Sequence, residues 1–247
     1  MTPEIEEGFA QIRARHGTAS LRRVEDMMVR SRVVRHPLQQ QAKYVMPGMT
    51  SKPWHDPYEY NELLPIVRGL EEMQPTFKAE IHQAIECSKL PNYAHYKVNQ
   101  DTWKALYLFR DGAPVVENES LVPATFRFMQ EKIGDWLCPL LEMHYSILAP
   151  GAIIPPHCDF WNFTINLHLA VDIPENCGIR VGNIERTWTE GKCLLFDYSY
   201  LHDAWNRSER RRICLLMDLW NPEVTPAERE GLVLMMTEIR RLMEGSA

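Results

Sequence analysis

The sequence lacks an apolar run long enough to cross a membrane, which takes roughly 18 to 20 residues. It also lacks the basic and then apolar start of a signal peptide, because residues 1–7 are acidic instead. Positive charge is not in excess either, since 27 basic and 33 acidic side chains give a net charge of −6. We therefore expect a cytoplasmic protein with no membrane span and no nucleic-acid partner.

Closely spaced cysteines are absent as well. Six cysteines are scattered over 247 residues without a CxxC pair. A chain of this length builds its own core, and such scattered thiols favour buried, neutral cysteines over a disulfide framework or a zinc site. Hydrophobic residues make up 45% and charged residues 24%, as is usual for a globular protein.

Helical spacing of apolar residues occurs in four parts of the chain. Residues 3–30 predict two short helices, and residues 61–88 predict two helices interrupted at Pro75. Residues 120–137 and 225–243 predict one helix each. A turn-rich stretch at 46–60 separates the first pair from the rest, so we predict a helical extension at 1–44 and a main domain at 45–247. The extension is interpreted as packing around the core, with a lid or a dimer surface as the alternatives.

Short strands dominate residues 143–219, with turn signals between them. The clearest strand, 162–169, alternates apolar side chains with Asn162, Thr164, Asn166 and His168. A face of neutral hydrogen-bonding groups is typical of a wet cavity rather than of an outer surface. Seven or eight such strands predict a sandwich or barrel, mainly β with flanking α-helices.

A metal-ligand pattern lies in this strand-rich half. His157 and Asp159 are two residues apart, so in a strand they point to the same side. His202 on a neighbouring strand would add a second imidazole. Two histidines and one carboxylate with an open opposite face are typical of non-haem Fe(II) oxygenases. Such a pattern also arises by chance, and the alternative reading is a structural metal site.

An anion anchor follows the second histidine. Arg212 stands ten residues after His202 and alternates onto the same strand face as Cys214. Its planar fork suits a carboxylate, so metal and arginine together indicate a 2-oxo-acid cosubstrate. The alternative is a surface charge beside Arg210 and Arg211.

Several phrases resemble the aspartyl/asparaginyl β-hydroxylase family and occur here in one order. They are PG at 47–48, PW at 53–54, YSILAPG at 145–151, IPPH at 154–157, LHL at 167–169, WTEGK at 188–192, FDYS at 196–199, HDAW at 202–205 and DLWNPE at 218–223. The resemblance implies a double-stranded β-helix, also called a jelly-roll or cupin-like fold. It further implies an Fe(II)-dependent dioxygenase that uses O2 and 2-oxoglutarate to hydroxylate an unactivated carbon, with release of succinate and CO2.

The same resemblance implies roles for single residues. Iron would lie on His157 and His202, and the distal carboxylate of 2-oxoglutarate on Arg212 and Ser146, with His168 nearby. Asp159 is a departure from the animal enzymes, which have glycine there, and it gives this chain a full set of three ligands.

Other departures concern the substrate. Where the animal members have arginines, this chain has Thr164 and Asn166, and residues 112–123 replace their cysteine-bearing loop. Their helical-repeat domain and membrane anchor have no counterpart in this sequence. We therefore expect a free amino acid, a short peptide or a carrier-bound residue as substrate. The candidate substrate contacts are Trp103, Arg110, His144, Asn162, Thr164 and Asn166.

Three functions stay open from the sequence. The favoured one is hydroxylation of the β-carbon of an amino acid or of an Asp/Asn-like peptidyl residue. The second is hydroxylation of an acyl chain, as in the similar lipid A hydroxylases. The third is a non-catalytic jelly-roll module in which the three ligands hold a structural metal.

Overall fold

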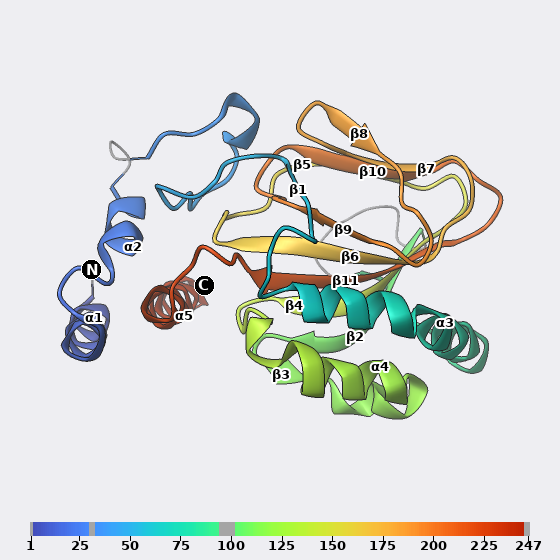
Figure 1. Ribbon diagram of the computed structural model, residues 1–247, viewed down its shortest axis with the longest axis horizontal. Helices are drawn as coiled ribbons and strands as arrows, with labels where there is room; N and C mark the ends of the chain where they lie inside the picture. The colour runs from blue at the N-terminus through green and yellow to red at the C-terminus, as the bar shows by residue number, and fades with distance from the viewer. Residues whose placement is uncertain (1, 30–32, 94–101, 245–247) are drawn as a thin grey trace.

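The computed structural model describes residues 2–29, 33–93 and 102–244. The parts of the two predicted domains that fall on residues 1, 30–32, 94–101 and 245–247 lie outside the described residues. Two antiparallel sheets form the core, one above the other in Figure 1. The larger sheet has the order β1-β9-β6-β11-β4-β2-β3 and the smaller one β5-β10-β7-β8. Their bounds are β1 Trp54–His55, β2 Trp103–Arg110, β3 Ala113–Pro114, β4 Glu142–Leu148, β5 Ile153–His157, β6 Thr164–Asp172, β7 Cys177–Val181, β8 Ile184–Arg186, β9 Cys193–Phe196, β10 His202–Asn206 and β11 Arg212–Trp220.

The chain winds back and forth between the two sheets. From β4 onward it places one strand in the larger sheet and the next in the smaller one, with the β7–β8 hairpin as one step of this path. This alternation defines a double-stranded β-helix, and it confirms the predicted jelly-roll fold. The first residue of β10 and the last residue of β5 face each other at one end of the smaller sheet.

The two faces of β6 differ as its alternation predicts. Ile165, Leu167 and Leu169 belong to the core cluster that α3 (Leu64–Cys87) covers with Leu70 and Phe77. The other face of the larger sheet looks toward the smaller sheet. Burying one apolar face under helices therefore leaves the polar face for the space between the sheets.

Helix α3 corrects the predicted break at Pro75. It runs unbroken from Leu64 to Cys87 with Pro75 inside it. Pro75 is exposed and removes one backbone hydrogen bond of the helix, while Leu70, Phe77 and Ile81 keep one continuous buried stripe. Burial of that stripe outweighs the missing hydrogen bond.

The predicted helix at 120–137 is also different in the structure. A 3-10 turn at Val116–Leu121 precedes α4 (Pro123–Phe128), and a π turn at Met129–Ile133 follows it. Pro123 fixes the first helical residue, so the helix begins there and not at Ser120.

The N-terminal helices α1 (Pro3–His16) and α2 (Arg22–Met27) pack against the C-terminal helix α5 (Pro226–Glu244), beside the sheets in Figure 1. The guanidinium of Arg23 donates two hydrogen bonds to Glu228, at 2.7 and 2.6 Å. Gly231 allows this approach, because a Cβ there would lie 2.7 Å from Leu21. The extension therefore packs on a helix of the main part, and its division at residue 44 stays a prediction.

Two features of the described residues bear on the composition. Within the described ranges, no helix is both long and apolar enough to span a membrane. All six cysteines are free, and four of them are buried, namely Cys138, Cys177, Cys193 and Cys214.

Candidate metal centre and cavity

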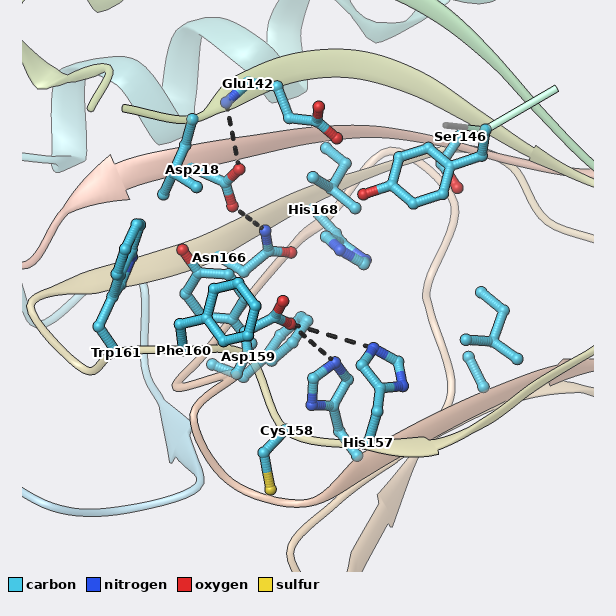
Figure 2. A pocket seen from close by; sticks show the side chains of 18 of the residues that line it. Glu142, Ser146, His157, Cys158, Asp159, Phe160, Trp161, Asn166, His168 and Asp218 are labelled. Atoms are coloured by element: carbon cyan, nitrogen blue, oxygen red, sulfur yellow. Dashed lines mark hydrogen bonds and ion pairs between the residues drawn. The ribbon is translucent and has the colours of Figure 1, made fainter. Parts of the chain in front are cut away.

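Three predicted ligands meet where β5 and β10 pair. His157 ends β5, His202 begins β10, and the two residues are partners in the register of the strands. Their ring centres lie 4.1 Å apart. Asp159 follows β5, and its Oδ2 lies 4.0 Å from Nε2 of His157 and 3.5 Å from Nε2 of His202. Figure 2 shows the carboxylate turned to both rings.

Backbone carbonyls orient both imidazoles. Nδ1 of His157 donates to the oxygen of Pro155 over 2.7 Å, and Nδ1 of His202 donates to the oxygen of Tyr200 over 2.8 Å. With the proton on Nδ1, the lone pair of each ring is on Nε2, on the side of Asp159. Each ring is thus set up as a neutral ligand.

Burial keeps these rings neutral. It lowers the pKa of His202 to about 3, with a further contribution from the neighbouring His157. Burial also lowers the pKa of His157. One donor atom from each of the three residues lies within 4.8 Å of the others. Two neutral imidazoles and a carboxylate so close together fit a divalent metal ion, and the donor set is the one found with Fe(II).

Arg212 is a buried cation with unmet hydrogen-bonding capacity. It begins β11, is only 1% exposed, and its Nε and Nη1 have no hydrogen-bond partner. Its guanidinium lies over the ring of Trp188, 4.9 Å from the ring centre. A buried guanidinium in this state is costly unless an anion binds it. The residue therefore fits the carboxylate of a ligand.

His168 lies next to this arginine. Its ring is stacked parallel to that of Trp188, and Trp188 Nε1 lies 3.4 Å from its Nδ1. Burial and then the charge of Arg212 lower the pKa of His168 well below its usual value. The Nε2 of His168 is buried without a partner, so a neutral ring offers one more polar atom beside Arg212.

Ser146 is on β4 and pairs with Cys214 of β11. Arg212 and Cys214 alternate onto the same face of β11, so Ser146 shares the interior with Arg212. Its Oγ accepts a hydrogen bond from Trp103 Nε1 at 2.9 Å. The hydroxyl proton of Ser146 remains for an acceptor in the interior.

A cavity of about 300 Å³ adjoins the three ligands. Its wall includes seven of the predicted site residues, namely Ser146, His157, Asp159, His168 and His202 and, of the substrate candidates, Trp103 and Asn166. Arg212 is not among the residues of the wall, but its guanidinium lies over the ring of Trp188, which is stacked on the ring of His168 in the wall. The three predicted metal ligands and two of the predicted cosubstrate residues, Ser146 and His168, thus gather at one cavity, which Arg212 does not line.

Three predicted substrate contacts are occupied elsewhere. Asn162 accepts from the backbone N–H of Met46 and donates to its carbonyl, so it fastens the loop before β1. The hydroxyl of Thr164 is bonded to that of Tyr198 at 2.6 Å. Arg110 lies over the ring of Tyr107, 4.8 Å from its centre. None of Arg110, Asn162 and Thr164 is among the described residues of the cavity wall.

Two buried carboxyl groups were missed from the sequence. Glu142 and Asp218 line the cavity opposite His157, as Figure 2 shows. Asp218 alternates with Arg212 along β11, and Glu142 stands on the face of β4 that carries Ser146. The alternation that singled out Arg212 could therefore have found both.

The N-terminal extension reaches the turn that precedes His202. Gln39 is buried, and its Nε2 donates to Ser199 Oγ at 2.9 Å and to Asp197 Oδ2 at 3.4 Å. Burial raises the pKa of Asp197 to about 7. Ser51 Oγ lies 2.6 Å from the hydroxyl of Tyr200, whose carbonyl holds His202. Residues outside the strands thus support a metal ligand.

Together these features define a double-stranded β-helix protein with a potential metal site at one end of its smaller sheet. Known proteins agree with this description. The model of the family described as aspartyl/asparaginyl beta-hydroxylase matches residues 71–222. The chain therefore belongs to the aspartyl/asparaginyl beta-hydroxylase family, as its motifs predict.

Individual relatives extend the comparison. The aspartyl/asparaginyl beta-hydroxylase of Mus musculus is 32% identical over 202 residues, which cover 78% of this chain and only 26% of that protein. An ornithine lipid ester-linked acyl 2-hydroxylase of Rhizobium tropici is 31% identical over 181 residues, or 69% of this chain and 63% of that protein. A Pseudomonas putida prolyl-4-hydroxylase structure matches 61% of this chain at 14% identity and a TM-score of 0.39.

Proposed function

We propose that the protein is an Fe(II)- and 2-oxoglutarate-dependent dioxygenase that hydroxylates the β-carbon of an amino acid or of an Asp/Asn-like peptidyl residue. Succinate and CO2 are the products of the cosubstrate. The observation that carries the proposal is Arg212, a buried guanidinium with two unmet donors over Trp188, close to a cavity whose wall includes the three predicted metal ligands.

His157, Asp159 and His202 would hold the metal. The chemistry that Fe(II) supplies when bound is the activation of O2, with 2-oxoglutarate as the co-reductant. The residues themselves contribute neutral imidazoles held by the carbonyls of Pro155 and Tyr200. This arrangement needs no proton release from the rings when a metal binds.

Arg212 would pair with the distal carboxylate of 2-oxoglutarate through its planar fork. Ser146 would donate its hydroxyl proton to the same end of the cosubstrate, since its Oγ already accepts from Trp103. His168 would offer Nε2, which is buried without a partner. These three groups select an anionic cosubstrate and orient it in the interior.

Acyl-chain hydroxylation is the second candidate. The relative from Rhizobium tropici is named an acyl 2-hydroxylase of an ornithine lipid, and the match covers most of both chains. The cavity argues for a smaller, more polar substrate, because Asn166 and the carboxyl groups of Glu142 and Asp218 are in its wall. A non-catalytic metal module would have no use for a buried, unpaired Arg212.

Turnover of 2-oxoglutarate tests the proposal. Purified protein with Fe(II) and O2 is supplied with amino acids, short peptides or acyl lipids, and succinate is measured together with the mass and NMR spectrum of the product. We expect succinate in proportion to a product that carries one added oxygen on the β-carbon of an amino-acid residue. Oxygen on an acyl chain would favour the second candidate, and bound metal without any succinate would favour the module.

A further inference from the structure

The end of the cavity away from His157 is built from hydrogen-bond acceptors. Asp218 is 4% exposed, and its Oδ1 accepts from Asn166 Nδ2 at 2.6 Å while its Oδ2 accepts from the backbone N–H of Glu142 at 3.3 Å. The carboxyl group of Glu142 is also buried and lines the same wall, and its Oε1 lies 3.3 Å from Nδ1 of the buried His144. Two carboxyl groups in one buried wall need a positive charge or a proton between them.

Asn166 gives an independent sign of a missing donor. It is 3% exposed, and although its Nδ2 is bonded to Asp218, its Oδ1 is buried without a hydrogen-bond partner. Figure 2 shows the amide nitrogen turned to Asp218 and the oxygen turned away from it, on the side of His168. A buried amide oxygen in a cavity wall calls for an N–H or O–H donor from a ligand.

No described side chain neutralises Asp218. Within the described ranges no basic residue forms an ion pair with it, and the guanidinium in the cavity wall, that of Arg240, is held by Asp111 at 3.3 Å and by the carbonyl of Leu140 at 2.5 Å. Burial, and then the charge of Glu142, raise the pKa of Asp218 well above its usual value. A ligand that brings a positive charge would relieve this cost.

Aromatic rings complete the surroundings. Tyr93 is stacked on Trp103 with ring centres 4.0 Å apart, and both line the cavity together with Trp161 and Tyr198. Aromatic faces attract an ammonium group, and they bury the methylenes next to it. Acceptors at one end and rings around them form a site for an amine rather than for an acid.

We propose that the substrate presents a primary ammonium group to Asp218 and the amide oxygen of Asn166. The inference rests on the proposed function, because it takes the cavity beside the metal ligands as the substrate site. The ammonium can be the α-amino group of a free amino acid or the side chain of a basic residue. Of the substrates in the proposed function, the inference favours a free amino acid and disfavours an Asp-like peptidyl residue recognised through its side-chain carboxylate, since that group would meet Asp218 and Glu142.

Four related probes distinguish an α-ammonium group from a side-chain ammonium group. L-lysine has both ammonium groups, L-norleucine only the α-ammonium, Nα-acetyl-L-lysine only the side-chain ammonium, and Nα-acetyl-L-norleucine neither. Each is titrated calorimetrically into anaerobic protein, both metal-free and with Fe(II) and 2-oxoglutarate. The variants are Asp218→Asn and Asn166→Leu, with Glu117→Gln as a control that removes an exposed charge. The visible band of the iron chelate and circular dichroism report whether each variant is folded.

We expect at least one ammonium-bearing probe to bind about tenfold to a hundredfold more tightly than Nα-acetyl-L-norleucine, the range of a charged hydrogen bond. Asp218→Asn should remove this preference, Asn166→Leu should weaken it, and Glu117→Gln should keep it. The inference would be overturned if Nα-acetyl-L-norleucine bound as tightly as the ammonium-bearing probes, or if their preference survived in Asp218→Asn. It would also be overturned if no ammonium-bearing probe bound at about 10 mM, which is the scale of weak binding.

The proposed function fails in a different way. A protein that forms the chelate but binds no ammonium probe keeps the proposed function and loses the inference. A protein that forms no chelate but shows an Asp218-dependent preference for ammonium in the metal-free titration keeps the amine site and loses the dioxygenase.

Discussion

The guanidinium of Arg212 lies 4.9 Å from the centre of the Trp188 ring, and that ring is parallel to the imidazole of His168. Among the described residues, Arg212 is therefore held by a ring face and by no carboxylate. A cation–π contact is worth about 2 kcal/mol when buried, which does not replace the hydrogen bonds that Nε and Nη1 lack. Under the proposed function, Arg212 would await an anionic ligand at a cost in stability.

The first prediction concerns that cost. Arg212→Met should raise the free energy of unfolding of the ligand-free protein by about 1 to 3 kcal/mol, because it replaces an unsatisfied buried charge with an apolar chain. Added 2-oxoglutarate should stabilise the parent protein and leave the variant unchanged. Denaturant unfolding measures both effects. Arg211→Met, at an exposed neighbour, serves as the control, and a larger loss of stability in Arg212→Met than in this control would contradict the account.

The second prediction concerns pH. The pKa of Asp197 is raised to about 7 by burial, from a usual value of 3.8, so between these values the folded state holds a proton that the unfolded state has lost. The contribution of Asp197 to stability should therefore fall as the pH rises from about 4 to 7. His55 and His202, whose pKa values burial lowers to about 4 and about 3, act with the opposite sign in an overlapping range.

Comparison with a variant isolates the effect of Asp197. From pH 5 to pH 7.5 the free energy of unfolding of the parent should fall relative to that of Asp197→Asn, because asparagine does not titrate. Asp135→Asn, which removes an exposed carboxyl group, should give a difference that stays flat. A flat difference for Asp197→Asn as well would show that this carboxyl group is ionised throughout.

The third prediction concerns the link from the N-terminal extension to His202. Gln39→Leu should cost about 1 to 3 kcal/mol, since Ser199 Oγ and Asp197 Oδ2 both lose the buried N–H donor of Gln39. It should also weaken metal binding, because these residues precede the carbonyl of Tyr200 that orients His202. Calorimetric metal titration checks the second effect, with Gln41→Leu at an exposed position as control. Unchanged affinity would show that the turn is held without Gln39.

Much of the fold and of the metal site follows from short-range patterns. The period-two alternation of Ile165, Leu167 and Leu169 with polar residues predicts a strand with one apolar face, and β6 has it. His157 and Asp159 are close because they are two residues apart, and His202 reaches them because β10 pairs with β5. A strand pattern gives the direction of each side chain, so it was sufficient to predict that His157 and Asp159 point to the same side.

Other features depend on long-range packing that no local pattern contains. Pro75 predicts a break in the helix, yet the buried stripe on α3 keeps the helix continuous. Asn162 has the polar alternation of its neighbours, but its amide is taken up by the backbone of Met46, 116 residues away. Asp218 was missed although it alternates with Arg212, because its role depends on contacts with Asn166 and Glu142 in neighbouring strands.

The visible spectrum of anaerobic protein mixed with Fe(II) and 2-oxoglutarate tests the central claim most directly. The account predicts a charge-transfer band of the chelate in the parent protein and none in His202→Ala. Arg212→Met should need about tenfold to a hundredfold more 2-oxoglutarate to form it, because the charged hydrogen bonds to the distal carboxylate are lost. Bound iron without a band in the parent protein would contradict the account, since the metal would then offer no open face to the cosubstrate.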